Sequence, residues 1–458
     1  MAHNLISRAR KDTLPLTVVE AAAQDKWRRG LLKAGRDWLD RTGFSGNSGS
    51  WTVMPGRNGN ADRAVFVVGA DTDMWSWSTL AARLPAGSYA ITGRLSKARA
   101  DDAALGWGLA AYEFTRYRKP RISRPDLVWP ANADQRHVRQ MLDATALLRD
   151  LINTPAEDLG PAELAGEARK VGRKHKANVR VTTGEALLKA NYPMIHMVGR
   201  ASDDAPRLID MRWGTRGPRV TLVGKGVCFD TGGLDLKPAA GMLRMKKDMG
   251  GAAHALALGQ LIMAAKLPVR LRVLIGAVEN AVAGNAYRPW DVLQTRKGIT
   301  VENANTDAEG RLVIGDCLAE ASREKPDVLL DFATLTGAAR VAVGTEIAAV
   351  FANDDKLYMD LEKHGTANAD PVWRLPLHGP YRRLLDSKVA DISSASDGPF
   401  GGAITAALFL KEFVDDDVPW AHFDIMAWNM GNRPGRPTGG EANGLRAAFA
   451  MIQERFGR

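Results

Sequence analysis

Cysteine is scarce in this chain, which has only Cys228 and Cys317 among 458 residues. Two cysteines cannot build a disulfide framework or a zinc site made of thiolates. So few cysteines are typical of a reducing compartment, and the opening stretch MAHNLISRARKDTLPL has no apolar core of signal-peptide length. We therefore expect a cytoplasmic protein in which both cysteines are small buried residues.

Several catalytic and membrane signatures are also missing. There is no HExxH among the eight histidines and no GxSxG, which excludes a thermolysin-like zinc site and a serine nucleophile elbow. A GxG at residues 224–226 lacks the third glycine and opens no helix, so it does not predict a dinucleotide site. The most apolar helical stretch, residues 250–266, is interrupted by His254 and Gln260. It predicts a buried helix with a core histidine and no membrane span.

Acidic residues are outnumbered, and the formal net charge is +10. Residues 1–128 hold much of the excess, with 20 Lys and Arg against 12 Asp and Glu. A basic surface can bind nucleic acid, but no basic stretch here has interleaved aromatic residues. We expect a solvated basic face, and keep nucleic-acid binding as a rival.

The chain predicts an α/β protein in three parts. Residues 1–127 mix strand-like and helix-like runs (64–70 and 105–118) and predict a small basic α/β domain. A proline-rich break and a strongly helical run ending at Pro155 predict a linker helix region over 128–156. Strands and helices then alternate, which predicts an α/β/α catalytic domain over 157–458 with a mixed, mainly parallel sheet. Its expected strands are 219–224, 269–278, 328–334 and 346–352, and its expected helices are 249–265 and 311–323.

Charged residues gather just beyond the ends of these expected strands. Sites in such sheets form at the loops beyond strand ends. Four carboxylates and two lysines are placed there. Carboxylates gathered without enough cations repel one another and are costly to bury, and several carboxylates together suit two divalent metals. For any one of these residues, the alternative to a metal ligand is a surface acid or a loop salt bridge.

If "NTDAEGRL" is extended, Asp307, Glu309 and Arg311 share one face. The cluster comprises Lys225, Asp230, Lys237, Asp248, Asp307 and Glu309.

Residues 140–430 contain the motifs "GKGVCFDTGG", "DMGGA", "NTDAEGRL", "DFATLTGA" and "WAHFDI". In their order and spacings these motifs resemble the leucyl aminopeptidase family, of the cytosol aminopeptidase type. The resemblance implies a metal-dependent aminopeptidase, a hydrolase that removes N-terminal residues from peptides. It also implies a homohexamer with two divalent ions per subunit, zinc or manganese, and a bound bicarbonate.

The resemblance further assigns roles to individual residues. Asp230 and Glu309 would bridge the two metals. Lys237 would stay charged and polarise the scissile carbonyl, and Arg311 would hold the bicarbonate that serves as general base. A lysine can bind a metal only as its neutral amine, which neighbouring cations and burial favour. The full implied ligand set is Lys225, Asp230, Asp248, Asp307 and Glu309.

Substrate contacts and rival functions complete the expectations. By the resemblance, Met245, Thr334 and Gly337 line the pocket for the first side chain, although Met245 could equally be a core residue. One metal would take the free α-amine, which would make the enzyme an exopeptidase. The rivals are a nucleic-acid-binding or regulatory protein on this fold, and a metal-dependent hydrolase of another class such as a phosphoesterase. A catalytically inactive homologue is disfavoured because every implied ligand is present.

Overall fold

The computed structural model describes residues 3–120 and 123–457, which fall into two compact units. The first unit holds the residues up to Ala146 together with Gly431–Thr438, and the second holds Leu147–Met430 and the residues from Gly439 onward. The boundary falls within α5 (Gln135–Asn153), so a helix is present where the sequence predicts a linker helix. The division at residues 127 and 156 stays a prediction.

The first unit is built on a six-stranded sheet in the order β1-β6-β5-β2-β4-β3, in which only β3 and β4 pair antiparallel. Side chains alternate along β4 (Ala61–Val68). Phe66 packs with Trp77 in one core cluster, and Val65 and Val67 pack with Leu39 in another. The sheet therefore buries both faces. The other elements are β1 (Leu5–Ile6), β2 (Leu14–Glu20), β3 (Trp51–Pro55), β5 (Ser88–Thr92), β6 (Asp126–Val128), α1 (Gln24–Arg29), α2 (Lys33–Arg41), α3 (Met74–Arg83) and α4 (Lys97–Ala110).

The expected helix over 105–118 is only partly correct, because α4 ends at Ala110. The helix begins earlier, after Ser96, whose side chain accepts the Arg99 N–H at 3.3 Å. The first half of this helix is polar, so the sequence shows no periodic pattern of apolar residues there that would predict a helix. Beyond Ala111 the chain becomes progressively exposed, so no buried face supports further helix.

The second unit carries an eight-stranded sheet in the order β15-β14-β17-β13-β9-β10-β8-β7. Its centre, β17-β13-β9-β10, is parallel, and β8 and β7 add antiparallel strands at one edge. The mixed, mainly parallel sheet and all four expected strands are confirmed. The strands are β7 (Asn178–Thr183), β8 (Arg207–Trp213), β9 (Arg219–Asp230), β10 (Arg270–Asn280), β13 (Val328–Ala333), β14 (Ala348–Ala352), β15 (Val372–Arg374) and β17 (Trp420–Asp424).

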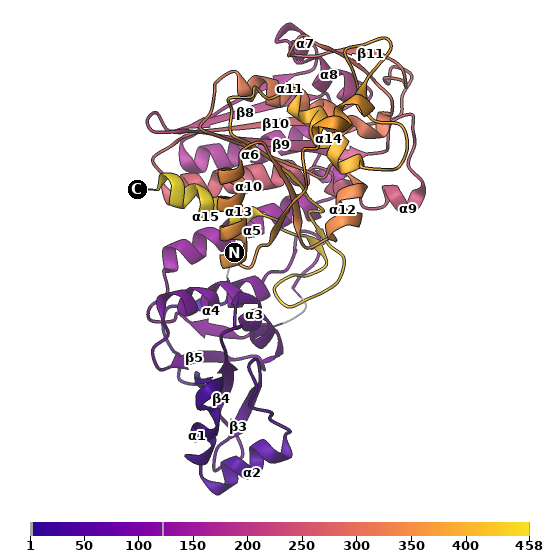
Figure 1. Cartoon of the computed structure of the whole chain (residues 1–458). Helices are drawn as coiled ribbons and strands as arrows, with labels where there is room; N and C mark the ends of the chain where they lie inside the picture. Colours follow the sequence, from indigo (N-terminus) through magenta and orange to yellow (C-terminus); the bar gives the residue numbers. More distant parts are fainter. Residues whose placement is uncertain (1–2, 121–122, 458) are drawn as a thin grey trace. The chain divides into compact units, whose positions relative to one another are not determined.

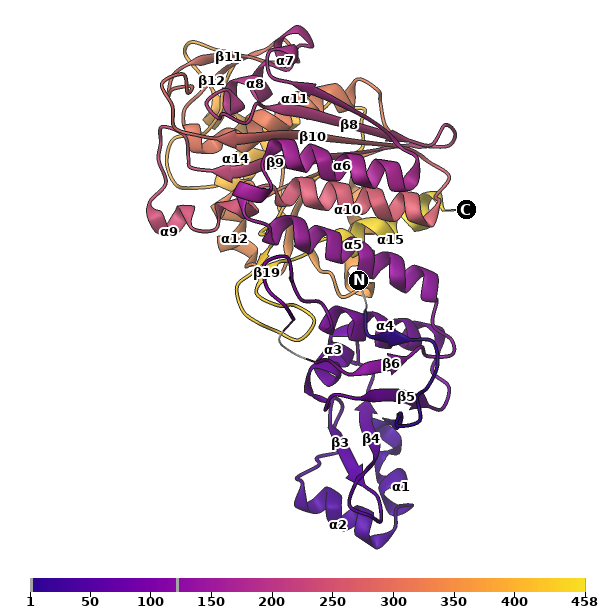
Figure 2. The same ribbon diagram turned by 180° about the vertical axis from the view of Figure 1, so that it is seen from behind.

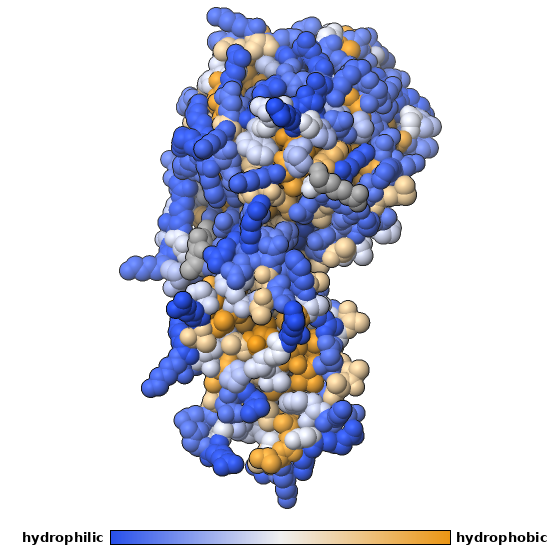
Figure 3. All heavy atoms as spheres, turned by 90° about the vertical axis from the view of Figure 1, so that its left-hand side faces the viewer, coloured by the Kyte–Doolittle hydropathy of each residue, from blue (hydrophilic) through white to orange (hydrophobic). Residues whose placement is uncertain are grey.

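Helices cover both faces of this sheet. Figures 1 and 2 show α6 (Pro161–His175), α10 (Gly250–Ala265) and α15 (Leu445–Phe456) on one face, and α8 (Pro193–Gly199), α11 (Glu309–Ser322) and α14 (Gly402–Lys411) on the other. The central strands are therefore buried almost throughout, as in parallel sheets with two helical layers. Figure 3 shows mainly hydrophilic residues on the visible face of this unit. Within the described residues, no helix combines the length and apolarity needed to cross a bilayer.

Candidate metal centre

The site forms at the carboxyl edge of the parallel strands. Asp230 ends β9, Asn280 ends β10 and Asp424 ends β17, while Thr334 directly follows β13. Because these strands are parallel neighbours, their ends meet at one edge of the sheet. That edge brings together side chains that are as much as 194 residues apart in the sequence, from Asp230 to Asp424.

The loop after β9 turns back on itself and returns Lys237 to the end of the strand. Gly232 and Gly233 take φ values of +90° and +66°, which L side chains rarely adopt. The Lys237 N–H donates to the Thr231 carbonyl at 2.9 Å and closes the loop. Asp230 is fixed in turn, because its Oδ1 accepts the Gly232 N–H at 2.9 Å. The loop therefore presents Asp230 and Lys237 side by side.

The "NTDAEGRL" stretch is not extended, so the expected reason for its convergence is wrong. Thr306–Ala308 is a 3-10 turn, and Glu309 is the first residue of α11. Asn305 Oδ1 accepts the Asp307 N–H at 2.7 Å, which favours a turn over a strand. Asp307 and Glu309 thus stand at a helix start, where the partial positive charge of the backbone N–H groups favours carboxylates.

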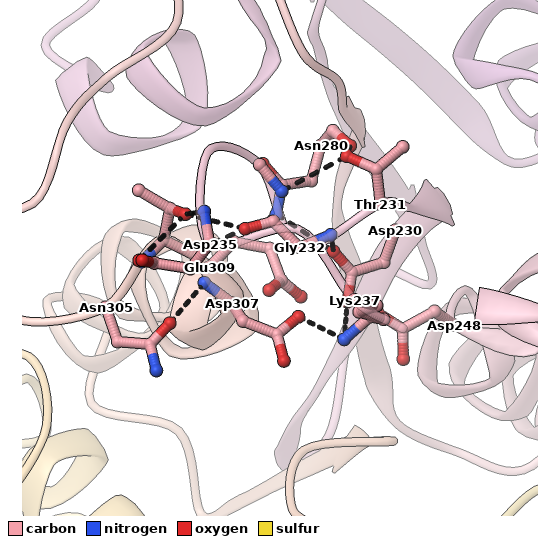
Figure 4. Close-up of polar contacts among 12 residues, drawn as sticks. Asp230, Thr231, Gly232, Asp235, Lys237, Asp248, Asn280, Asn305, Asp307 and Glu309 are labelled. Atoms are coloured by element: carbon pink, nitrogen blue, oxygen red, sulfur yellow. Dashed lines mark hydrogen bonds and ion pairs between the residues drawn. The ribbon is translucent and has the colours of Figure 1, made fainter. Parts of the chain in front are cut away.

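Four carboxylates and two lysines meet in one cluster, and Figure 4 shows the carboxylates with Lys237. Lys225 Nζ lies 2.5 Å from Asp248 Oδ2 and 2.8 Å from Glu309 Oε1. Lys237 Nζ lies 2.8 Å from Asp230 Oδ2 and also pairs with Asp307. Oxygens of Asp230, Asp307 and Glu309 lie within 4.8 Å of one another, which is the spacing of ligands around a metal ion.

Burial makes this cluster electrostatically costly. Burial, with the nearby charge of Asp230, raises the pKa of Glu309 to about 8. The same two causes raise the pKa of Asp307. Burial acts to lower the pKa of Lys225, but the charges of Asp248 and Glu309 outweigh it and raise that pKa. Two ammonium groups therefore leave four neighbouring carboxylates incompletely neutralised.

The donor set fits divalent metal ions. Among the described residues, the buried Oε2 of Glu309 has no hydrogen-bond partner, and such an atom is costly unless a ligand reaches it. Carboxylate oxygens are ligands for zinc and manganese, and a deprotonated Lys225 amine adds a nitrogen. The residues that could hold metal are Lys225, Asp230, Asp248, Asp307 and Glu309.

Arg311 is buried on α11, two residues after Glu309. Its Nη1 donates to the Ser394 carbonyl at 2.7 Å, while its buried Nε has no partner within the described chain. No carboxylate of the described residues pairs with it within 4.0 Å. Burial lowers the pKa of Arg311 to about 10, so the guanidinium remains charged at neutral pH. It keeps donors free for a small planar anion.

A cavity of about 300 Å³ opens over the cluster. All the site residues expected from the sequence line it except Glu309, which is buried in contact with Lys225. Met245, Thr334 and Gly337 form part of its wall. Thr334 Oγ1 donates to Asp248 Oδ1 at 2.7 Å, so the wall is tied to the cluster.

Three supporting residues were not predicted. Asn280 Nδ2 donates to Asp230 Oδ1 at 2.8 Å, and the Tyr287 hydroxyl donates to the Thr306 carbonyl at 2.7 Å. Asp424 Oδ1 accepts the N–H groups of Leu335 and Thr336 at 3.1 Å each. A polar residue ending a parallel strand is the signal that could have identified Asn280 and Asp424.

His254 and the cysteines are core residues, as expected. His254 is fully buried, its Nδ1 lies 2.7 Å from the Gly250 carbonyl, and its Nε2 accepts the Asn443 N–H at 2.9 Å. Burial lowers the pKa of His254 to about 4, so it is neutral. Cys228 and Cys317 are buried free thiols.

Gly310 leaves the space that Lys225 occupies, which gives a testable prediction. A Cβ at this position would lie 2.5 Å from Lys225 Cε and 2.7 Å from its Nζ. Gly310→Ala should therefore overpack the site and lower the free energy of unfolding by about 1–3 kcal/mol. Gly166→Ala on α6 is the matched control, because its Cβ would meet nothing within 4 Å. The control should be neutral or stabilising by about 0.5–1 kcal/mol, as for alanine replacing glycine in a helix. Equal stabilities of the two variants in denaturant unfolding would contradict this packing.

Comparison with known proteins shows which family the chain matches. Residues 146–449 match the "Cytosol aminopeptidase family, catalytic domain", and residues 14–130 match the "M17 aminopeptidase, N-terminal domain". A probable cytosol aminopeptidase of Nitrobacter hamburgensis is 41% identical over 372 residues, covering 77% of this chain and 72% of that protein. One from Rhodopseudomonas palustris is 38% identical over 422 residues, covering 85% and 83%.

Solved structures agree with these relatives. The cytosol aminopeptidase from Coxiella burnetii superposes with a TM-score of 0.94 at 45% identity, covering 99% of both chains. The bottromycin maturation enzyme BotP in complex with Mn gives a TM-score of 0.86 at 31% identity, covering 97% of this chain and 99% of that one. The chain belongs to the cytosol aminopeptidase family, and is a metal-dependent aminopeptidase of the leucyl aminopeptidase type.

Proposed function

We propose that this enzyme hydrolyses the first peptide bond of peptides with a free α-amino group, using two divalent ions, zinc or manganese. The observation that carries the proposal is the convergence of four carboxylates on Lys225 and Lys237, with a buried Glu309 oxygen that has no partner in the described chain. Two divalent ions bound there would polarise the peptide carbonyl and activate a water for attack. Asp230 and Glu309 would be the ligands shared by the two ions in this proposal. Both are buried, Asp230 beside Lys237 and Glu309 beside Lys225.

Lys237 and Arg311 supply the remaining chemistry. Burial acts to lower the pKa of Lys237, but Asp230 and Asp307 outweigh it and raise that pKa, so the group is an ammonium at neutral pH. An ammonium facing the cavity would stabilise the oxyanion that forms on the substrate carbonyl. Arg311 would hold a bicarbonate in its guanidinium fork, and the bicarbonate would accept the proton of the attacking water.

The substrate pocket and the oligomeric state are proposed from the family resemblance. The first side chain would lie against Met245, Thr334 and Gly337, which line the cavity. We further propose a cytoplasmic homohexamer acting on peptides. Residues 14–130 match an aminopeptidase N-terminal domain, and nucleic-acid binding by the basic residues of this region stays the less favoured alternative.

A three-substrate comparison tests the reaction class. The enzyme reconstituted with manganese or zinc should cleave leucyl p-nitroanilide and leave both the N-acetyl form and p-nitrophenyl phosphate intact. Acetylation removes the amine that a metal would take and adds bulk in the site. Comparable cleavage of the free and acetylated anilides would rule out an exopeptidase. Cleavage of the phosphate ester alone would favour a phosphoesterase.

A further inference from the structure

Two cations line the cavity without belonging to the proposed metal and bicarbonate machinery. Lys247 precedes the proposed ligand Asp248, and Arg340 lies on α12 (Gly337–Val343). Both line the same cavity as Met245, Thr334 and Gly337. The lining carboxylates are Asp230, Asp248 and Asp307, and all three belong to the metal cluster. None of them is therefore free to neutralise Lys247 or Arg340 once metal is bound.

Lys247 has a buried side chain whose terminal nitrogen lacks a hydrogen-bond acceptor among the described residues. Its side chain is only 4% exposed, and its nearest carboxylate oxygen, Asp248 Oδ1, lies 3.9 Å away. That oxygen already accepts the Thr334 hydroxyl at 2.7 Å, and the other Asp248 oxygen contacts Lys225 at 2.5 Å. Burying a cation without acceptors is unfavourable, so an anion arriving from the cavity would gain by meeting it.

Arg340 is similarly short of partners. Within the described chain its guanidinium pairs with no carboxylate within 4.0 Å. Its Nη1 donates only to the Met426 sulfur at 3.4 Å, and a thioether is a weak acceptor. Its Nη2 lies 3.2 Å from where a Cβ on Gly337 would stand, so the guanidinium lies directly against the cavity wall. The planar fork of this group suits a carboxylate with two oxygens.

We propose that Lys247 and Arg340 form a subsite for the side-chain carboxylate of an N-terminal glutamate or aspartate. The inference rests on the proposed function, because it takes this cavity as the pocket for the first residue. An acidic side chain would supply the acceptors that both cations lack. Leucine would leave both cations without a carboxylate hydrogen-bond partner, and an N-terminal lysine or arginine would be repelled. The enzyme should therefore favour acidic first residues over neutral residues of the same shape.

The test compares peptides X-Ala-Ala-amide with Glu, Gln, Leu or Lys as the first residue, using the metal-loaded enzyme. We expect kcat/KM for Glu to exceed that for Gln by roughly tenfold or more, as for a charge-assisted contact. Arg340→Gln and Lys247→Met should each reduce the Glu/Gln ratio by roughly tenfold. Arg323→Gln removes the same charge from an exposed arginine at the end of α11 and should keep the ratio. A parent ratio near one, or a ratio that Arg340→Gln leaves unchanged, would overturn the subsite.

A second arm separates this proposal from the proposed function. Binding of free L-glutamate and L-glutamine is measured by calorimetry on the metal-loaded parent and on Arg340→Gln. If no peptide is cleaved but glutamate still binds more tightly in an Arg340-dependent way, the subsite stands and the peptidase assignment falls. If Gln or Leu peptides are cleaved with no glutamate preference, the peptidase stands and the subsite falls. A preference for free-acid over amidated Gln-Ala-Ala that Arg340→Gln removes would assign the cations to a C-terminal carboxylate and overturn the proposal.

Discussion

Replacing Glu309 with alanine should remove bound metal and nearly all turnover, whereas replacing Arg311 should leave the metal bound. Glu309 is buried within the cluster, its Oε1 lies 2.8 Å from Lys225 Nζ, and its Oε2 is without a partner in the described chain. Arg311 carries no metal-binding atom, and Arg311→Ala should slow turnover by roughly 10² or more, as for loss of a general base.

Metal content and turnover measured on the same samples check this division of roles. Added bicarbonate should stimulate the parent enzyme and have no effect on Arg311→Ala, because the fork that holds the anion is gone. Equal loss of metal from the Glu309 and Arg311 variants would contradict the assignment. So would full bicarbonate stimulation of Arg311→Ala.

Lys237→Ala should depress kcat by about 10²–10³ with little change in KM. The ammonium would meet the substrate oxygen where negative charge develops, so its contact strengthens in the transition state. Its present partners, Asp230 at 2.8 Å and Asp307, are themselves proposed metal ligands, so the ammonium should become free to face substrate when metal is bound.

Steady-state kinetics of the metal-loaded variant measure this split between kcat and KM. Lys189→Ala, at an exposed position on α7 (Ala186–Lys189), is the matched charge control and should behave like the parent. An unchanged kcat in Lys237→Ala would remove the catalytic role of Lys237 and leave the metal site standing. A rise in KM alone would make Lys237 a substrate-binding residue.

The central sheet was predictable because burial on both faces leaves a strong local signal. The strands expected at 219–224 and 328–334 are apolar runs with charged residues beyond them, and both are present as β9 and β13. Their parallel order then brings Asp230 and Thr334 to one edge. The motif "NTDAEGRL" likewise reaches that edge, because Thr306 Oγ1 donates to the Gly232 carbonyl at 2.6 Å.

Local conformation at the site was not predictable in the same way. Alternating charges suggested a strand at Asp307–Arg311, but the Asn305 side chain stabilises a turn that leads into α11. A period of two in a short polar stretch does not distinguish a strand from a helix start when a capping residue precedes it.

The sequence also showed no sign that Lys247 and Arg340 lack a carboxylate hydrogen-bond partner among the described residues. Whether a cation has a carboxylate partner depends on residues brought close by folding, as with Met426 beside Arg340. Nothing in the local pattern of either segment separates such a cation from an ordinary surface charge.

Metal titration of turnover tests the central claim most directly. Enzyme stripped by a chelator should be inactive towards leucyl p-nitroanilide. Addition of manganese or zinc should restore activity, with elemental analysis giving about two ions per active chain, as for a two-metal hydrolase. Full activity in the stripped enzyme, or active protein without bound divalent metal, would contradict the account.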